Sequence, residues 1–477
     1  MLLKPSVKSS GRFLLDSEAF LLSAITVLAA LLRIYSLTSK SLWMDEGFSI
    51  FMGQTSTANF IHFVRGSEMN MVLYYWLLRG WMHLGNSELF IKLLSVIPSV
   101  ATAPVIYFLG RRLFDRRLAL IASLLLALHP AHIAYAQEAR GYALAVFLIS
   151  LSSLFFLRTL EQPSGKNWAT YAVLTILAIY SHMFAALVVL AHWTAYFAAA
   201  RRTLRWSTVL KIVFALALPL GPMMIFVVTR HSGVAKWIER PAWNDVLELF
   251  HFLTLPKYWM FFYLLGWGVA LWAALRARSR NQDIWPYQFL FAWLLLPIFV
   301  ALSISLYRPV LVSRFLLICA PAAILVAAAG LSLLQRWARI LMLAAMVLGS
   351  FNSALSYYRH PQLKEDWRGT SVYLLSQAEP EDNVIVLPGY GRFTFDYYRE
   401  VNPAAAVPLR FPDLDSPLDG ERIWLIVYES SDPMARDVIR KLRNAPGSSY
   451  CEIKSQQFNL IKVWLLQRCD RSAPRLK

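Results

Sequence analysis

Residues 88–144 read ELFIKLLSVIPSVATAPVIYFLGRRLFDRRLALIASLLLALHPAHIAYAQEARGYAL. Two apolar runs, 91–109 and 118–136, flank the basic cluster RRLFDRR, and a polar turn with Glu138 and Arg140 follows the second run. Apolar stretches of this length match the hydrocarbon thickness of a bilayer when they are helical. Basic clusters between such runs act as topology determinants. The stretch therefore predicts a polytopic helical membrane protein.

The composition of the whole chain agrees with this fold class. Of its 477 residues, 57% are hydrophobic, 14% aromatic and only 16% charged, and the mean hydropathy is +0.46. The net charge of +18 does not indicate nucleic-acid binding, because Lys and Arg fall in short clusters between apolar runs, beside anionic lipid. Three cysteines without a Cys-x-x-Cys pair exclude a metal or disulfide framework.

Apolar runs that span a bilayer, or nearly do, predict about eleven helices. The runs are 19–37, 91–109, 118–136, 141–157, 168–181, 183–200, 211–229, 258–275, 285–306, 311–330 and 339–357. The basic N-terminus MLLKPSVKSSGRF precedes the first run without a small-residue cleavage site. We therefore expect a retained first helix rather than a removed signal peptide.

The basic clusters also predict an orientation in the inner (plasma) membrane. With the N-terminus in the cytoplasm, the inner loops contain RRLFDRR, RTLEQPSGK, RRTLRW, RARSR and QRWAR, as the positive-inside rule requires. The unusual polar residues then share the outer face, which holds Asp45 and Glu46, the QEARGY turn, His182, the segment 228–243, YRPVLVSR and everything after about residue 358.

Two domains are predicted. Residues 1–357 form a transmembrane domain, in which the aromatic and charged first outer loop, 38–90, is expected to contain helices lying at the interface. Residues 358–477 are more polar and alternate β-type runs (NVIVLP, RIWLIVY, NLIKVWLL) with helix-like stretches (DWRGTSVYLLSQ, PMARDVIRKL). This alternation predicts a small extracytoplasmic α/β domain. A hairpin near its end could join Cys451 to Cys469.

Ionisable residues at the rim of a membrane need a partner or a task, and the outer face collects several. Asp45 and Glu46 follow the first run, and the others are Glu68, Glu138, Arg140, His182 and Arg314. Carboxylates with a few cations suit a reaction in which a base removes a proton from an acceptor while cations hold an anionic leaving group. We expect one cavity open to the outer leaflet to be lined by Asp45, Glu68, Glu138, His182 and Arg314.

Each of these residues also has a plainer interpretation. Asp45 or Glu46 could be a solvated helix-end carboxylate, and Glu138 with Arg140 could be a structural ion pair. His182, in an apolar turn, could be a satisfied structural histidine. Arg314 could extend its side chain to the interface.

Several motifs in order resemble those of bacterial membrane glycosyltransferases of family 39. They are SLWMDEGFS, LYYWLLRGW preceded by an acidic residue, the stretch 88–144, YSHMF, LVSRFLLICAPA and KEDWRGTSVYL. That family is similar to protein O-mannosyltransferases and to the aminoarabinose transferase of lipid A, and has the glycosyltransferase type C fold. The likeness covers the chain up to about residue 380.

The resemblance implies an inverting transfer of a sugar from a polyprenyl-phosphate carrier to an acceptor on the outer face. Asp45 matches the catalytic carboxylate of the family's first outer loop, Glu46 could share its role, and Glu138 matches the second acidic position. The chain reads Asn70, Met71 and Val72 where many relatives have His-Pro-Pro. The role of that histidine is therefore absent here, and acceptor choice is less certain than donor class.

The remaining assignments follow from chemistry at a membrane surface. Arg140 and Arg314 could bind the donor phosphate, and Asp45 with Glu138 could hold one divalent metal ion that neutralises it. The substrate-binding candidates are Glu68, Tyr74, His182, Lys364 and Asp366. The expected partners are a polyprenyl-phosphate-linked sugar, a lipid, glycan or protein acceptor, and membrane lipids.

The rival function is a transporter or lipid flippase. It predicts charges near the bilayer midplane and discontinuous helices in paired halves. In this chain the acidic residues fall at helix ends on one side and the halves show no symmetry.

Overall fold

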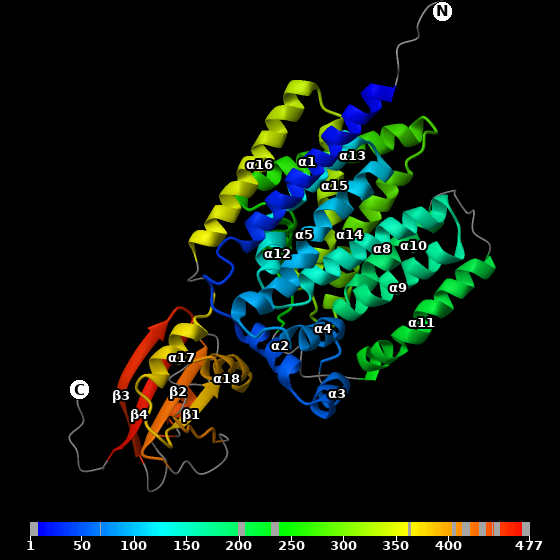
Figure 1. Cartoon of the computed structure of the whole chain (residues 1–477). Helices are drawn as coiled ribbons and strands as arrows, with labels where there is room; N and C mark the ends of the chain where they lie inside the picture. Colours follow the sequence, from blue (N-terminus) through cyan, green and yellow to red (C-terminus); the bar gives the residue numbers. More distant parts are fainter. Residues whose placement is uncertain are drawn as a thin grey trace, which may run out of the picture. The chain divides into compact units, whose positions relative to one another are not determined.

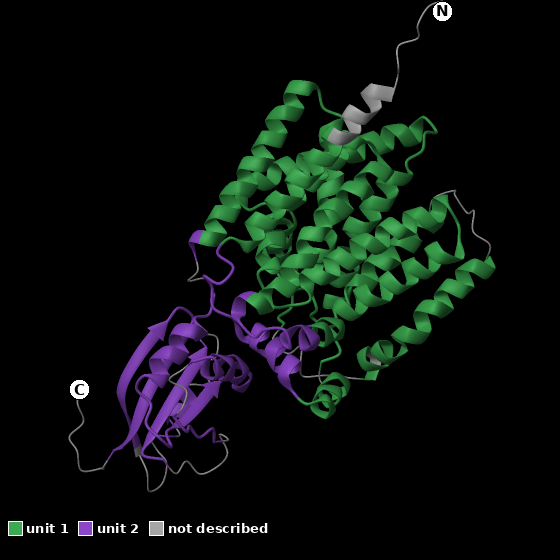
Figure 2. Ribbon diagram, in the orientation of Figure 1, with its two compact units in different colours: residues 1–35, 56–77, 90–358 green, residues 36–55, 78–89, 359–477 purple. Residues whose placement is uncertain are grey.

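The computed structural model describes residues 8–66, 68–198, 206–229, 238–360, 364–402, 407–412, 420–428, 436–440, 442 and 449–469. The chain forms two compact units (Figure 2). We call residues 1–35, 56–77 and 90–358 the membrane unit, and residues 36–55, 78–89 and 359–477 the sheet unit. Half of the predicted outer segment 228–243, residues 230–237, lies outside the described residues.

The membrane unit is helical throughout (Figure 1). Its long helices are α1 (Lys8–Ile34), α5 (Glu88–Leu113), α8 (Tyr142–Glu161), α11 (Trp206–Thr229), α13 (Met260–Ser279), α14 (Trp285–Ser305), α15 (Ala320–Ser332) and α16 (Arg336–Arg359). Shorter ones are α6 (Arg116–Leu128), α7 (Pro130–Ala136), α9 (Gly165–Ser181), α10 (Ala185–Ala198), α12 (Trp243–Leu253), η2 (Lys257–Trp259) and η3 (Ser313–Cys319). The polytopic helical fold is confirmed.

The number of spans depends on three of the eleven predicted runs. Eight helical segments in the described chain are long and apolar enough to cross a membrane, and the bent pair α6–α7 would make a ninth. The 55° bend falls at Pro130, which begins α7 and cannot donate the hydrogen bond that would continue α6. Helices α9 and α10 have only 17 and 14 residues, so each is short for a span of its own.

The centre of the membrane unit is built from small residues. Helix α15 is buried along nearly its whole length, and it packs against α13. A Cβ atom on Gly330 would lie 2.0 Å from the carbonyl oxygen of Gly266. The two backbones therefore touch at a point where only glycine fits, as is typical of helix pairs in membranes.

The first outer loop contains three short helices, α2 (Met44–Gln54), α3 (Thr57–Gly66) and α4 (Val72–Met82). Of these, α2 belongs to the sheet unit, α3 belongs to the membrane unit, and α4 contributes residues to both. The loop is thus helical, as its mixed composition predicted. Its first helix carries both Asp45 and Glu46.

The sheet unit is built on a four-stranded sheet in the order β1-β2-β4-β3. β1 (Asn383–Leu387) pairs in parallel with β2 (Arg422–Tyr428), which pairs antiparallel with β4 (Ile461–Cys469), and β3 (Ser449–Phe458) forms a hairpin with β4. The three predicted β-type runs fall on β1, β2 and β4, which confirms the small sheet domain.

Two helices and a disulfide complete the sheet unit. Helix α17 (Trp367–Leu375) contacts β3 and β4, while α18 (Arg392–Glu400) contacts α17 and α2. Cys451 and Cys469 are bonded across the β3–β4 hairpin, with their Cα atoms 5.8 Å apart, so the predicted pairing is confirmed. Of the predicted helix 433–442, the described residues 436–440 and 442 are helical, and the other four lie outside the described residues.

Candidate active site

Helix α2 places its two acidic residues in its first turn, directly after Trp43. The Glu46 carboxylate accepts a hydrogen bond from the backbone N–H of Trp43 at 3.3 Å, which satisfies a donor left without a partner at the start of a helix. Negative charge is also favoured there by the helix dipole. The local sequence therefore explains why a helix begins at Met44.

Glu46 makes a second interaction that fixes its role. Its Oε2 atom lies 2.7 Å from Nζ of Lys364, and the side chains of Glu46 and Lys364 are 0% and 15% exposed. A carboxylate buried to this extent is stable in the ionised form only with such a partner. Glu46 is thus part of the structure that holds α2 in the sheet unit.

Asp45 points elsewhere and is only partly buried. Its Oδ1 atom accepts a hydrogen bond of 2.6 Å from the hydroxyl of Tyr390, which lies in η5 (Gly389–Gly391). The Asp45 carboxylate is therefore oriented by a hydroxyl, and Asp45 is less buried than Glu46.

The helix α18 holds α2 by close contact. The Phe393 ring stacks on that of Phe51 with centroids 4.2 Å apart. A Cβ atom on Gly47 would lie 2.0 Å from Oγ1 of Thr394, so the glycine of the DEGFS motif allows the two helices to approach. These contacts position the turn that carries Asp45.

Glu365 was not a candidate from the sequence, yet it binds the same turn. Its Oε2 atom accepts the backbone N–H of Met44 at 3.0 Å and also the indole N–H of Trp367. Burial, and secondarily the nearby charge of Asp45, raise the pKa of Glu365 to about 7. The two hydrogen bonds lower this pKa, but by less than burial raises it.

The other residues of the KEDWRG motif are likewise used within the sheet unit. Asp366 caps α17 by accepting the backbone N–H of Gly369 at 2.9 Å. Arg368 binds Glu88 with an N–O distance of 2.7 Å, and the hydroxyl of Tyr398 donates to the same carboxylate at 3.0 Å. The structure thus gives Lys364 and Asp366 structural contacts, whereas the sequence suggested only substrate binding.

In the membrane unit, Arg140 lies at the start of α8 among aromatic rings. It is buried, donates to the hydroxyl of Tyr75 at 3.1 Å, and has its guanidinium carbon 5.9 Å from the centre of the Tyr142 ring. Ser95 donates to the carbonyl of Arg140 at 3.2 Å and is hydrogen-bonded to the hydroxyl of Tyr74. Tyr74 therefore helps to position Arg140.

His182 lies in the turn between α9 and α10, next to this arginine. Its ring centre is 5.4 Å from that of Tyr142 and 5.1 Å from that of Phe315. Burial, and secondarily the charges of Arg140 and Arg314, lower the pKa of His182 to about 3. The imidazole is therefore neutral near pH 7 and cannot supply a positive charge.

Arg314 and Glu138 belong to the same neighbourhood. The guanidinium carbon of Arg314 lies 5.7 Å from the centre of the Phe315 ring, which itself contacts His182. Electrostatic interactions link Tyr135, in α7, to both Glu138 and Arg314. The backbone N–H of Arg140 donates to the carbonyl of Glu138 at 2.8 Å.

A single glycine permits this convergence. A Cβ atom on Gly141 would lie 2.6 Å from the carbonyl of Ser181, so the start of α8 touches the end of α9. The side chain of Asn70 accepts the backbone N–H of Met183 at 3.0 Å, which ties the α3–α4 connection to the same turn. Asn70 thus has a structural partner at the position where the sequence departs from its relatives.

The structure therefore brings the candidate residues together in two groups. Tyr74, Glu138, Arg140, His182 and Arg314 converge in the membrane unit, while Asp45, Glu46, Lys364 and Asp366 lie together in the sheet unit. Glu68 is partly buried in the α3–α4 connection of the membrane unit. That Asp45 faces Glu138 stays a prediction, because the two residues belong to different units.

The described residues contain no group of three or more His, Cys, Asp or Glu side chains that could hold a metal ion. The predicted metal site would combine Asp45 with Glu138, one from each unit. Because the two residues lie in different units, the metal site stays a prediction.

Comparison with known proteins identifies the fold. Residues 71–226 match the family described as dolichyl-phosphate-mannose-protein mannosyltransferase. Crystal structures of ArnT from Cupriavidus metallidurans, bound to undecaprenyl phosphate or in the apo state, are 14% and 15% identical, with TM-scores of 0.60 and 0.61, and each match covers 93% of this chain and 97% of that chain.

The oligosaccharyltransferase of Archaeoglobus fulgidus, tethered with an acceptor peptide, is 13% identical with a TM-score of 0.55, over 83% of this chain and 64% of that chain. No curated protein matches the sequence closely enough to count as a relative. The type C glycosyltransferase fold expected from the motifs is confirmed.

Proposed function

We propose that this chain, a type C glycosyltransferase by its fold and its family match, transfers a sugar from a polyprenyl-phosphate-linked donor to a lipid, glycan or protein acceptor. The family matched by residues 71–226 is one of mannosyltransferases, and the similar ArnT was solved with undecaprenyl phosphate. The observation that carries the proposal is the oriented carboxylate of Asp45 at the start of α2, next to a Glu46 already bound by Lys364.

In this mechanism Asp45 acts as the general base. Its carboxylate removes the proton from an acceptor hydroxyl or amine, whose oxygen or nitrogen then forms a bond to the anomeric carbon of the donor. The bond between that carbon and the phosphate oxygen breaks, and polyprenyl phosphate leaves with the bonding electron pair. Attack opposite the leaving phosphate inverts the configuration of the anomeric carbon.

Arg140 and Arg314 are proposed to hold the leaving phosphate. Guanidinium groups remain charged near pH 7 and form paired hydrogen bonds with phosphate oxygens. The neutral His182 between them keeps the two cations packed against aromatic rings without adding charge. Glu138 lies in the same turn as Arg140, and we propose that it binds the sugar or the acceptor. Glu68 and Tyr74 are proposed to shape the same region.

We further propose that the sheet unit lies outside the cytoplasm. The Cys451–Cys469 disulfide supports this location, because such bonds persist in oxidising compartments. It agrees with the orientation set by the basic clusters, in which the N-terminus is cytoplasmic. The transporter alternative is not favoured, since the fold and the family match are those of transferases.

The test is transfer by the purified full-length protein from a panel of polyprenyl-phosphate sugars, with released polyprenyl phosphate as the readout. Asp45→Asn should lower turnover by about 10²- to 10⁴-fold without lowering the unfolding temperature. Glu46→Gln is measured beside it, and Asp437→Asn, a surface carboxylate bound to Arg440, serves as the matched control.

Two outcomes would contradict the proposal. Undiminished turnover in Asp45→Asn would remove Asp45 as the base, and no transfer from any donor would remove the activity. The metal site expected from the sequence is tested by exhaustive chelation, since an ion held by Asp45 and Glu138 would make transfer depend on added divalent metal.

A further inference from the structure

A basic cavity lies between the C-terminal ends of two helices, away from the residues of the candidate active site. It has a volume of about 640 Å³ between the last turns of α5 and α8. It is lined by Phe108, Arg111, Arg112, Leu154, Phe155, Arg158 and Glu161. Along α8 (Tyr142–Glu161), Arg158 lies about 27 Å of helix from Arg140. The cavity is therefore at the opposite end of α8 from the proposed phosphate-binding cluster.

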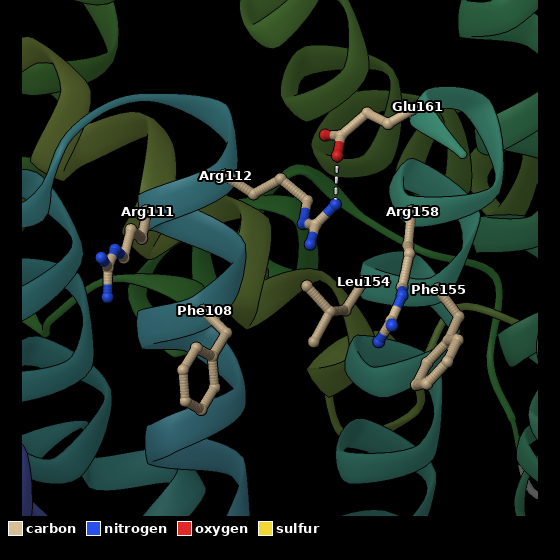
Figure 3. Close-up of a pocket in the computed structure, with 7 residues that line it drawn as sticks. All are labelled: Phe108, Arg111, Arg112, Leu154, Phe155, Arg158 and Glu161. Atoms are coloured by element: carbon tan, nitrogen blue, oxygen red, sulfur yellow. Dashed lines mark hydrogen bonds and ion pairs between the residues drawn. The ribbon is translucent and has the colours of Figure 1, made fainter. Parts of the chain in front are cut away.

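The cavity carries more positive than negative charge. Figure 3 shows Arg112 and Arg158 extending into the space between the two helices, with Arg112 bound to Glu161. Arg111 turns to the other side of α5, where Glu18 binds it at 2.9 Å. Arg158 has no carboxylate partner among the described residues, and its guanidinium carbon lies 5.7 Å from the centre of the Phe155 ring. An anion could therefore approach Arg158 without displacing an acid.

The remaining lining is apolar and comes from the turns nearer the middle of each helix. Phe108 is 48% exposed, and Leu154 and Phe155 are partly exposed. Both α5 and α8 are long and apolar enough to cross a membrane. These side chains therefore border the hydrocarbon region, while the arginines lie at the helix ends. A cationic rim above an apolar wall fits an amphiphile whose headgroup is an anion.

We propose that this cavity binds the phosphodiester headgroup of an anionic membrane phospholipid, with its acyl chains against Phe108, Leu154 and Phe155. The orientation set by the basic clusters places this lipid in the cytoplasmic leaflet. The lipid bridges the last turns of α5 and α8 and so holds the two helices together. A free phosphate ion would use the arginines but not the apolar wall.

The test uses the full-length protein in detergent with measured amounts of added lipid, and native mass spectrometry counts the lipids bound. Phosphatidylglycerol should bind more tightly than phosphatidylcholine with identical acyl chains, and it should raise the unfolding temperature by about 2–4 °C. Arg158→Gln should weaken phosphatidylglycerol binding about fivefold. The charge-conserving Arg158→Lys should keep most of the wild-type binding.

The matched control is Arg117→Gln, which removes the same charge from the predicted inner cluster RRLFDRR, at a position that does not line the cavity. It should leave phosphatidylglycerol binding unchanged. Equal binding of the two lipids, or equal loss in Arg117→Gln and Arg158→Gln, would overturn the proposal. Full displacement of phosphatidylglycerol by millimolar inorganic phosphate would show a simple anion site and would overturn it as well. None of these readouts depends on sugar transfer.

Discussion

Replacing Lys364 by methionine should release the start of α2. Methionine has a similar length but no charge, so the change removes the positive charge of Lys364 beside Glu46 and leaves most of the packing intact. The Glu46 side chain is 0% exposed and its carboxylate lies 2.7 Å from Nζ of Lys364. Removing one partner of a buried ion pair costs about 3–5 kcal/mol.

The lower end of this range applies here. Lys364 is 15% exposed, so water can reach part of the site after the substitution, and the backbone N–H of Trp43 still donates to Glu46. We therefore expect a cost of about 3 kcal/mol. In Glu46→Gln the partly exposed lysine can be hydrated, so that variant should be milder. The double variant Glu46→Gln/Lys364→Met should recover about 2 kcal/mol relative to the sum of the two single changes.

The assay is hydrogen exchange of the full-length protein. The backbone amides of α2 exchange when the helix opens locally, so their exchange rates report the free energy of that opening. A loss of about 3 kcal/mol corresponds to exchange that is about a hundredfold faster. The amides of α15 should not change. Lys454→Met, which alters a lysine of the same unit bound to the neutral Gln377, should leave α2 unaffected. Exchange of α2 within threefold of the wild type in Lys364→Met would refute the reasoning.

Three further predictions concern the sheet unit. The pKa of Glu365 is about 7 in the folded protein, against an ordinary value of 4.5. Between these two pH values the folded state binds a proton that the unfolded state has lost, so the free energy of unfolding should fall as pH rises from about 4.5 to 7. Glu365→Gln should flatten the unfolding temperature over that window, and an unchanged slope would exclude Glu365 as its source. Tyr390→Phe removes the hydrogen bond to Asp45 and should lower kcat about tenfold, with KM unchanged; a change in KM alone would show that Tyr390 binds substrate instead. Alkylation without reductant should leave Cys451 and Cys469 unmodified, and Cys319, which is buried, should stay unreactive after reduction; two labelled thiols before reduction would show that the bond does not form.

Much of the fold follows from composition and period. The apolar runs predicted the helices because a bilayer requires length and low polarity over many consecutive residues. The strands of the sheet unit followed from β-branched runs between turn residues. The span count was harder to predict because α9 and α10 are helical and apolar but short. No local pattern separates a short span from a helix that ends within the membrane.

The site was only partly predictable. Asp45, Glu138, Arg140 and Arg314 were chosen as candidates because charged residues beside apolar runs are rare. Tyr390 and Glu365 carry no such signal, since tyrosine and glutamate are ordinary in a polar domain. Their contacts with the start of α2 join residues separated by 345 and 321 positions in the sequence. A single sequence does not encode such pairs in its local pattern.

Which member of the Asp45–Glu46 pair faces inward depends on the residue at which the helix begins. Consecutive residues on a helix point about 100° apart, so two adjacent carboxylates cannot share one environment. A glutamate at the third helical position commonly binds the backbone N–H of the residue before the helix, and Glu46 holds that position after Trp43. Tryptophan is not among the favoured residues before a helix, which hides the helix start and leaves the two acids equivalent in the sequence. Once the start is known, Glu46 is expected to bind the start of the helix, and we propose Asp45, the less buried acid, as the general base.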